Sequence, residues 1–363
     1  MNKLTLGLLG ALLAVSPLPA ATNAVPPPAG AAGEAAADSV TQELRAVMTA
    51  DDAAQDEVNG WIHANDALTT VTNKTELNEL LNKRITARFD LVRQDYEKFL
   101  RNHPDSARGY LAYGSFLNDI GDEDGAKTQY ENSRQLDPKN PAVWNNLANY
   151  YGEHNQVTNA FAAYAEAIRL KPDEPVYYQN FATTVYLFRT DAREFYHLED
   201  PQVFDKALGL YRQALQLAPD NFVLATDYAE SYYGIRPLRT NDALAAWTNA
   251  LHIAHTDAER QGVELHLARV KIAAGFFNEA RAHLGVVTNE AFLDLQKRLT
   301  RSLAEHEFAA TNPAVTAAPA AAALTNQPVF SSQLNPTAAP VPLNESKAAA
   351  LLVVPPPSGQ APQ

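Results

Sequence analysis

Apolar residues recur at helical spacing over most of the chain, between about residues 39 and 305. In the N-terminal segment 39–74 the pattern predicts two helices, one starting at Asp38 or Ser39 and one running from Asp51 to Leu68. A longer helix is expected from Thr75 to about Asn102. Its apolar stripe repeats at three- and four-residue steps and comprises Leu77, Leu80, Leu81, Ile85, Phe89, Val92, Tyr96 and Phe99.

From this helix onward, small and aromatic residues return with a fixed period. Ala126 and Ala160 lie 34 residues apart, as do Tyr130 and Tyr164. A period of this length is typical of stacked helical hairpins, because one hairpin cannot bury its apolar face alone. The sequence therefore predicts an all-α helical-hairpin solenoid over residues 75–306. Its units are expected at 107–140, 141–174, 175–221 with an insertion at 189–204, 222–257 and 261–288, followed by a closing helix at 289–305.

The unit 141–174 resembles the tetratricopeptide repeat family. Its pattern positions are held by Trp144, Leu147, Ala148, Tyr151, Ala160, Tyr164, Ala167, Leu170 and Pro172. The resemblance extends over about residues 86–288 and implies a right-handed superhelix. It also implies a concave groove that is lined by the first helix of each unit and binds an extended peptide.

The resemblance also implies which residues face that groove. The expected partner-binding residues are Asn145, Asn149, Gln179, Thr183, Tyr186, Thr226, Glu230, Tyr233 and Arg269. The middle of the groove has no Lys or Arg for clamping a terminal carboxylate, whereas carboxamides can pair with the backbone of a bound peptide. Two alternatives remain open: the polar groups are merely solvated, and the tyrosines pack against the insertion.

Both ends of the chain differ in composition from the repeats. Residues 1–24 have the charged start, apolar stretch and small residues of a signal peptide, which predicts export to the periplasm, cell envelope or exterior. No other stretch is apolar enough to span a membrane after cleavage of the signal peptide. Residues 25–38 are expected to form an Ala/Pro-rich linker, and residues 307–363 a disordered tail that acts as a tether.

Charge and motif content narrow the range of functions. The formal net charge of −13 argues against a nucleic-acid partner, which would require a basic face. The chain has no cysteine and no hydrolase, zinc-protease or phosphate-loop motif, so we predict no catalytic residue and no cofactor. His252, His255 and Asp257 resemble a metal site only in spacing, and a helix-end role for His255 is preferred, so no metal is predicted.

These observations favour a non-catalytic scaffold that binds a protein or peptide partner. One alternative is a structural subunit or assembly factor of a cell-envelope complex. Another is an envelope enzyme with its site in the insertion, where charged residues cluster around two aromatic ones: Arg193, Glu194, Phe195, Tyr196, His197, Glu199 and Asp200. The homo-oligomeric state is left open.

Overall fold

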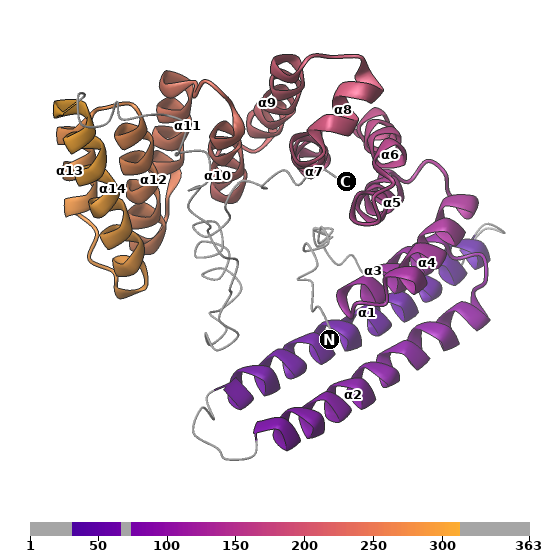
Figure 1. The fold of residues 1–363 in the computed structure, drawn as a ribbon. Helices are drawn as coiled ribbons and strands as arrows, with labels where there is room; N and C mark the ends of the chain where they lie inside the picture. The colour runs from indigo at the N-terminus through magenta and orange to yellow at the C-terminus, as the bar shows by residue number, and fades with distance from the viewer. Residues whose placement is uncertain (1–30, 67–73, 313–363) are drawn as a thin grey trace, which may run out of the picture. The chain divides into compact units, whose positions relative to one another are not determined.

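A computed structural model describes residues 31–66 and 74–312. Within these ranges the chain forms fourteen α-helices and two short 3-10 helices, and no strand (Figure 1). It divides into two compact units, the first ending at Pro172 and the second beginning at Asp173. The predicted signal peptide, the first part of the linker and the tail from residue 313 lie outside the described residues.

The helices of unit 1 form three antiparallel pairs: α1 Ala31–Asp66 with α2 Lys74–Asn102, α3 Ala107–Asp119 with α4 Glu123–Leu136, and α5 Pro141–Glu153 with α6 Val157–Leu170. Those of unit 2 are α7 Pro175–Leu187, α8 Arg189–Tyr196, α9 Asp200–Leu217, α10 Phe222–Ser231, α11 Thr240–Ile253, α12 Asp257–Ala273, α13 Phe277–Gly285 and α14 Leu293–Thr311, with the 3-10 helices η1 Tyr232–Gly234 and η2 Glu290–Phe292. The all-α hairpin architecture predicted from the period is confirmed.

The starts and turns of the hairpins are encoded locally. At the start of α5, Asn140 accepts a hydrogen bond from the Ala142 amide, and Pro141 occupies the first helical position. Between the helices of three hairpins, one residue has a left-handed backbone with positive φ: Gly121 at 81°, Asn155 at 57° and Gly275 at 81°. Glycine and asparagine tolerate this conformation best, and it turns the chain back sharply after each first helix.

Small residues lie where the helices of a pair cross. Ala148 of α5 and Ala160 of α6 are both 0% exposed. Around them the interior of unit 1 is filled by larger side chains, among them Phe116, Leu147 and Phe161. The alanines therefore set how closely α5 and α6 approach.

Replacing Ala160 by leucine is expected to lower the free energy of unfolding by about 1–3 kcal/mol, because the added atoms overpack a closed contact. The matched control is Ala162→Leu, at an exposed position of the same helix. Urea denaturation followed by circular dichroism measures both changes. Equal stability of the two variants would contradict close packing at Ala160.

The N-terminal segment differs from its prediction. Instead of two helices and a linker reaching residue 38, one continuous helix, α1, runs from Ala31 to Asp66. Asp51, read as the start of a second helix, instead lies inside α1, where it accepts hydrogen bonds from Tyr96 at 3.0 Å and from Gln55 at 3.5 Å. On α2 every buried side chain lies between Val92 and Leu100, near the end that packs on α3.

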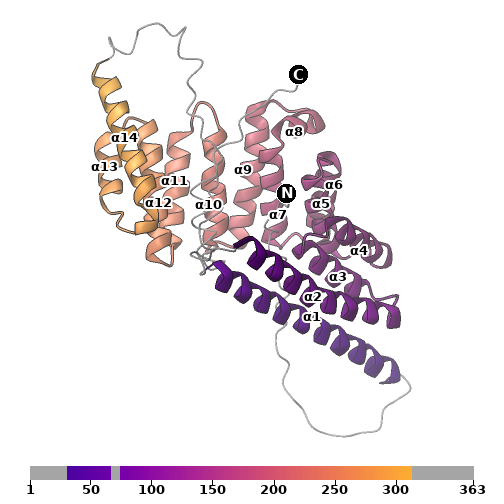
Figure 2. The same cartoon turned by 60° about the horizontal axis from the view of Figure 1, so that its bottom comes forward.

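Unit 2 continues the hairpin pattern. Helices α7 and α9 pair, and so do α10 with α11 and α12 with α13, while α14 packs on α12 and α13. Helices α9 to α12 lie side by side in both ribbon views (Figures 1 and 2). The predicted insertion, 189–204, contains helix α8 and the first residues of α9, and α8 packs against α7 and α9. The closing helix α14 starts later than predicted and continues to Thr311, so the first residues assigned to the tail are helical.

Within residues 31–66 and 74–312, none of the helices combines the length and apolar character that crossing a bilayer requires.

Candidate functional site

The two carboxamides predicted for unit 1 are already engaged within the unit. Asn145 is only 7% exposed and donates to the Asn146 side chain at 3.4 Å. Asn149 accepts a hydrogen bond from the buried Tyr164 hydroxyl at 2.7 Å. Removing the Asn149 carboxamide would therefore deprive Tyr164 of this acceptor, so the residue also has a structural role.

In unit 2, three predicted residues line one side of α7. Gln179 donates through Nε2 to Asp227 Oδ2 at 2.6 Å, which links α7 to α10. The Thr183 hydroxyl lies 2.7 Å from that of Tyr211. Tyr186 packs with its ring centroid 6.1 Å from that of Phe204, and burial raises the pKa of its hydroxyl. All three are half-buried.

The predicted residues of α10 and η1 have different surroundings. Thr226 is 3% exposed and donates to backbone carbonyls of its own helix, so its hydroxyl is held in the interior. Glu230 is half-buried; its Oε1 atom is buried and has no hydrogen-bond partner within the described chain. Burial, followed by the nearby Asp227 carboxylate, raises the pKa of Glu230 to about 8.

A stack of rings joins η1, α11 and α12. The Tyr233 hydroxyl lies 2.9 Å from Nδ1 of His266. The His266 ring stacks on Trp247 with centroids 4.0 Å apart and an interplanar angle of 12°. The guanidinium carbon of Arg269 lies 4.3 Å from the centroid of the Tyr233 ring, a distance suited to a cation–π interaction.

Together these contacts define a polar face of unit 2, formed by Gln179, Thr183, Asp227, Glu230, Tyr233 and Arg269. It is continuous because hydrogen bonds connect α7 to α10 and η1 to α12. The repeat positions did not identify Asp227, which follows Thr226 directly, or His266, which lies three residues before Arg269. The spacing of Asp227 and Glu230, one helical turn apart, was a signal available in the sequence.

A cavity of about 380 Å³ lies elsewhere in unit 2, among α9, α10 and α11. Arg212, Tyr228 and Tyr232 contribute to its lining, and the two tyrosine hydroxyls lie 2.8 Å apart. None of the predicted partner-binding residues lines it. The polar face therefore remains the candidate site.

With this geometry established, comparison with known proteins identifies the repeat. The sequence model of the tetratricopeptide repeat matches residues 141–174, which span α5 and α6. These residues are a tetratricopeptide repeat. No curated protein matches the chain in sequence.

Solved structures with similar helical repeats have low sequence identity to this chain. MamA is 21% identical, with a TM-score of 0.38, over 47% of this chain and 92% of that one. PilF of Pseudomonas aeruginosa is 16% identical, with a TM-score of 0.43, over 71% and 99%. The C-terminal part of a TPR repeat-containing protein from Cytophaga hutchinsonii is 13% identical, with a TM-score of 0.46, over 70% and 98%.

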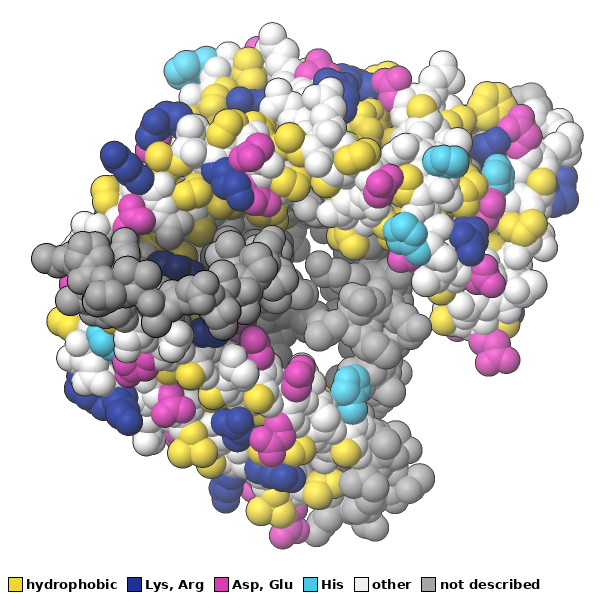
Figure 3. All heavy atoms as spheres, turned by 180° about the vertical axis from the view of Figure 1, so that it is seen from behind, with side chains coloured by type: hydrophobic (Ala, Val, Ile, Leu, Met, Phe, Trp, Pro, Cys, Tyr) yellow, Lys and Arg dark blue, Asp and Glu magenta, His cyan; other side chains and the backbone are white. Residues whose placement is uncertain are grey.

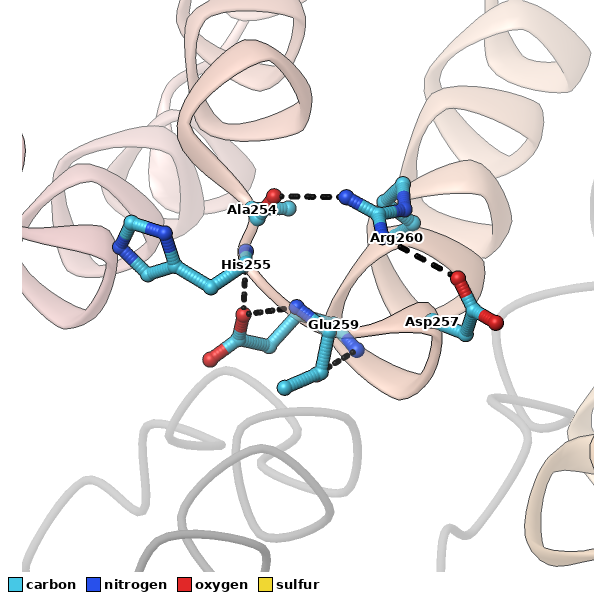
Figure 4. Close-up of polar contacts among 6 residues, drawn as sticks. Ala254, His255, Asp257, Glu259 and Arg260 are labelled. Atoms are coloured by element: carbon cyan, nitrogen blue, oxygen red, sulfur yellow. Dashed lines mark hydrogen bonds and ion pairs between the residues drawn. The ribbon is translucent and has the colours of Figure 1, made fainter.

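The next feature is the segment with His252, His255 and Asp257, whose spacing resembles a metal site. His255 precedes α12 and points away from Asp257, which pairs with Arg260 at 3.1 Å (Figure 4). The His255 amide donates to Glu259, whose backbone in turn donates to the Thr256 hydroxyl, so this segment is a helix cap. Among the described residues, no group of three His, Cys, Asp or Glu side chains is placed to hold a metal ion.

The charged residues of the insertion have structural contacts. Arg193 of α8 lies 3.6 Å from Asp200, and Glu199 caps the start of α9. Lys206 of α9 lies over the Tyr196 ring at 4.1 Å, while Phe195 is 42% exposed. On the molecular face in Figure 3, basic side chains are scattered among acidic and apolar ones.

Proposed function

We propose that this chain is a non-catalytic scaffold that binds a protein or peptide partner through the polar face of unit 2. The observation that supports the proposal is that Glu230 Oε1 is buried without a hydrogen-bond partner among the described residues, on the face where Gln179 links α7 to α10 and Arg269 of α12 lies over Tyr233. A polar atom buried without a partner costs free energy, so the stability of unit 2 alone does not explain a carboxyl group at this position.

The N-terminal sequence supports a location for this interaction. Residues 1–24 have the pattern of a signal peptide, so we propose that the chain is exported and meets its partner in the periplasm or cell envelope. The absence of cysteine is compatible with either redox compartment.

Replacing Arg269 by alanine is expected to weaken binding of the natural partner at least tenfold, because the guanidinium is half-exposed at the edge of the polar face. The test is affinity purification with the immobilised full chain from its own cell envelope, followed by mass spectrometry. Arg298→Ala, an exposed arginine on α14, is the matched control and is expected to retain the same partner. Equal recovery by both variants would exclude this face as the binding surface.

A further inference from the structure

The cavity among α9, α10 and α11 is separate from the polar face. Helix α10 packs against both α9 and α11, and the cavity between the three has a volume of about 380 Å³ (Figure 1). None of the residues that form the polar face lines it. Small-molecule sites in proteins have volumes of about 300–1,000 Å³, so the cavity is large enough for a small ligand.

Two tyrosines from one turn of the chain, Tyr228 and Tyr232, line this cavity. Their hydroxyl oxygens lie 2.8 Å apart, and their rings meet edge to face with centroids 5.4 Å apart. Tyr232 is only 2% exposed, so packing fixes its position. The hydrogen bond between the hydroxyls uses one of their two protons, and the second proton can be donated to an acceptor of a ligand.

Three charged residues also line the cavity: Arg212 of α9, Arg239 directly before α11, and Asp242 in the first turn of α11. Arg239 donates to Asp205 at 2.5 Å, and this pairing compensates its charge. Neither Arg212 nor Asp242 forms an ion pair with any residue that the structure describes. One positive and one negative charge, on different helices, are thus left uncompensated at the same cavity.

Both uncompensated charges lie near the Tyr232 hydroxyl. Burial raises the pKa of Tyr232, followed by the hydrogen bond with Tyr228. The Asp242 carboxylate raises this pKa further, and the Arg212 guanidinium lowers it. The two charges therefore act on one hydroxyl group from α11 and from α9, with opposite signs.

We propose that this cavity binds a small zwitterion, a free α-amino acid with an apolar side chain. Its carboxylate pairs with Arg212 and accepts a hydrogen bond from the tyrosine hydroxyls, and its ammonium group pairs with Asp242. Its side chain packs against the tyrosine rings and Leu215, which supply the apolar part of the lining.

The charge balance distinguishes this ligand from a simple ion. A simple anion would compensate Arg212 but would be repelled by Asp242, and a simple cation would meet the reverse situation. A zwitterion compensates both residues. This binding site is independent of the proposed partner binding at the polar face.

The first test compares ligands on the unaltered full chain by isothermal titration calorimetry. L-Phenylalanine is expected to bind saturably, with a Kd below about 1 mM. Hydrocinnamate has the ring and the carboxylate but no ammonium group, and phenethylamine has the ring and the ammonium group but no carboxylate. Each is expected to bind at least tenfold more weakly than phenylalanine, because each leaves one charged residue of the cavity unpaired.

Two variants assign the ends of the ligand to their partners. Arg212→Gln is expected to weaken binding of phenylalanine at least tenfold, but not that of phenethylamine, which has no carboxylate to lose. Asp242→Asn is expected to weaken binding of phenylalanine at least tenfold, but not that of hydrocinnamate. Arg298→Gln and Asp294→Asn, at exposed positions of α14, are the matched controls and are expected to bind all three ligands as wild type does.

Asp242 also lies where a carboxylate stabilises the start of a helix, so circular dichroism is used to verify that each variant is folded. The comparison of ligands on the unaltered chain does not depend on the variants. No saturable binding of phenylalanine or leucine would overturn the inference. Hydrocinnamate or phenethylamine bound as tightly as phenylalanine would show a site for a simple ion and overturn it as well. Neither result would affect the proposed partner binding.

Discussion

Replacing Trp247 by alanine is expected to lower the free energy of unfolding of unit 2 by about 3–5 kcal/mol. The indole is 0% exposed and stacks on His266, and its centroid lies 6.0 Å from that of the Tyr233 ring. Truncation would leave a cavity beneath the ring stack that connects η1, α11 and α12. Urea denaturation followed by circular dichroism measures the change without depending on tryptophan fluorescence.

The neighbouring Thr248 provides the control for this experiment. It is exposed on the same helix, so Thr248→Ala is expected to change the stability by less than about 0.5 kcal/mol. A loss below about 1 kcal/mol for Trp247→Ala would show that the ring stack does not anchor α11 to α12.

The second large effect is a loss of stability on acidification, caused by His266. Burial, with a smaller contribution from Arg269, lowers the pKa of His266 to about 3, against 6.5 for the unperturbed side chain. Below pH 6.5 the unfolded chain takes up a proton at this position and the folded chain does not, so stability falls until about pH 3. Each pKa unit corresponds to about 1.4 kcal/mol, so the full loss is on the order of 5 kcal/mol.

His266→Phe isolates this contribution. The variant keeps a ring against Trp247 but cannot be protonated, so the difference in stability from wild type is expected to shift in favour of the variant as the pH is lowered from 7 to 3. Glu230 acts in the opposite sense: its raised pKa means that stability is lost as the pH rises from 4.5 to about 8. The wild type and His266→Phe share this effect of Glu230, so it cancels in their difference. Parallel curves of stability against pH for the two proteins would refute a buried neutral His266.

Much of the fold could be predicted because the repeat period reflects the packing of each helical hairpin against the next one. The register of Ala148, Ala160 and Tyr164 placed the helices of 141–174 close to where α5 and α6 lie. Continuity of α1 was not predictable in the same way. Asp51 has the local character of a helix start, and only the hydroxyl of Tyr96, 45 positions later in the chain, explains its place inside a helix.

For the candidate site, the sequence predicted which residues lie on the first helix of each unit but not the contacts of their side chains. The register placed Gln179, Glu230 and Arg269 on the first helices of their units, and the structure brings them into one polar face. The register could not show that the Thr226 hydroxyl donates to a backbone carbonyl of its own helix, because a threonine in any helix can form this hydrogen bond. The role of Asp227 depends on the reach of Gln179 across helices, which spacing along one helix cannot reveal.

The long α1–α2 pair has a consequence for how the chain can vary between relatives. At 36 residues, α1 extends about 54 Å, against about 20 Å for the 13 residues of α3. The side chains buried on α2 lie near one end, so the opposite end depends mainly on contacts between the two helices themselves. Deletion or insertion of whole helical turns at that opposite end would change the length of the α1–α2 pair. The spacing of the hairpins after residue 107 would stay the same.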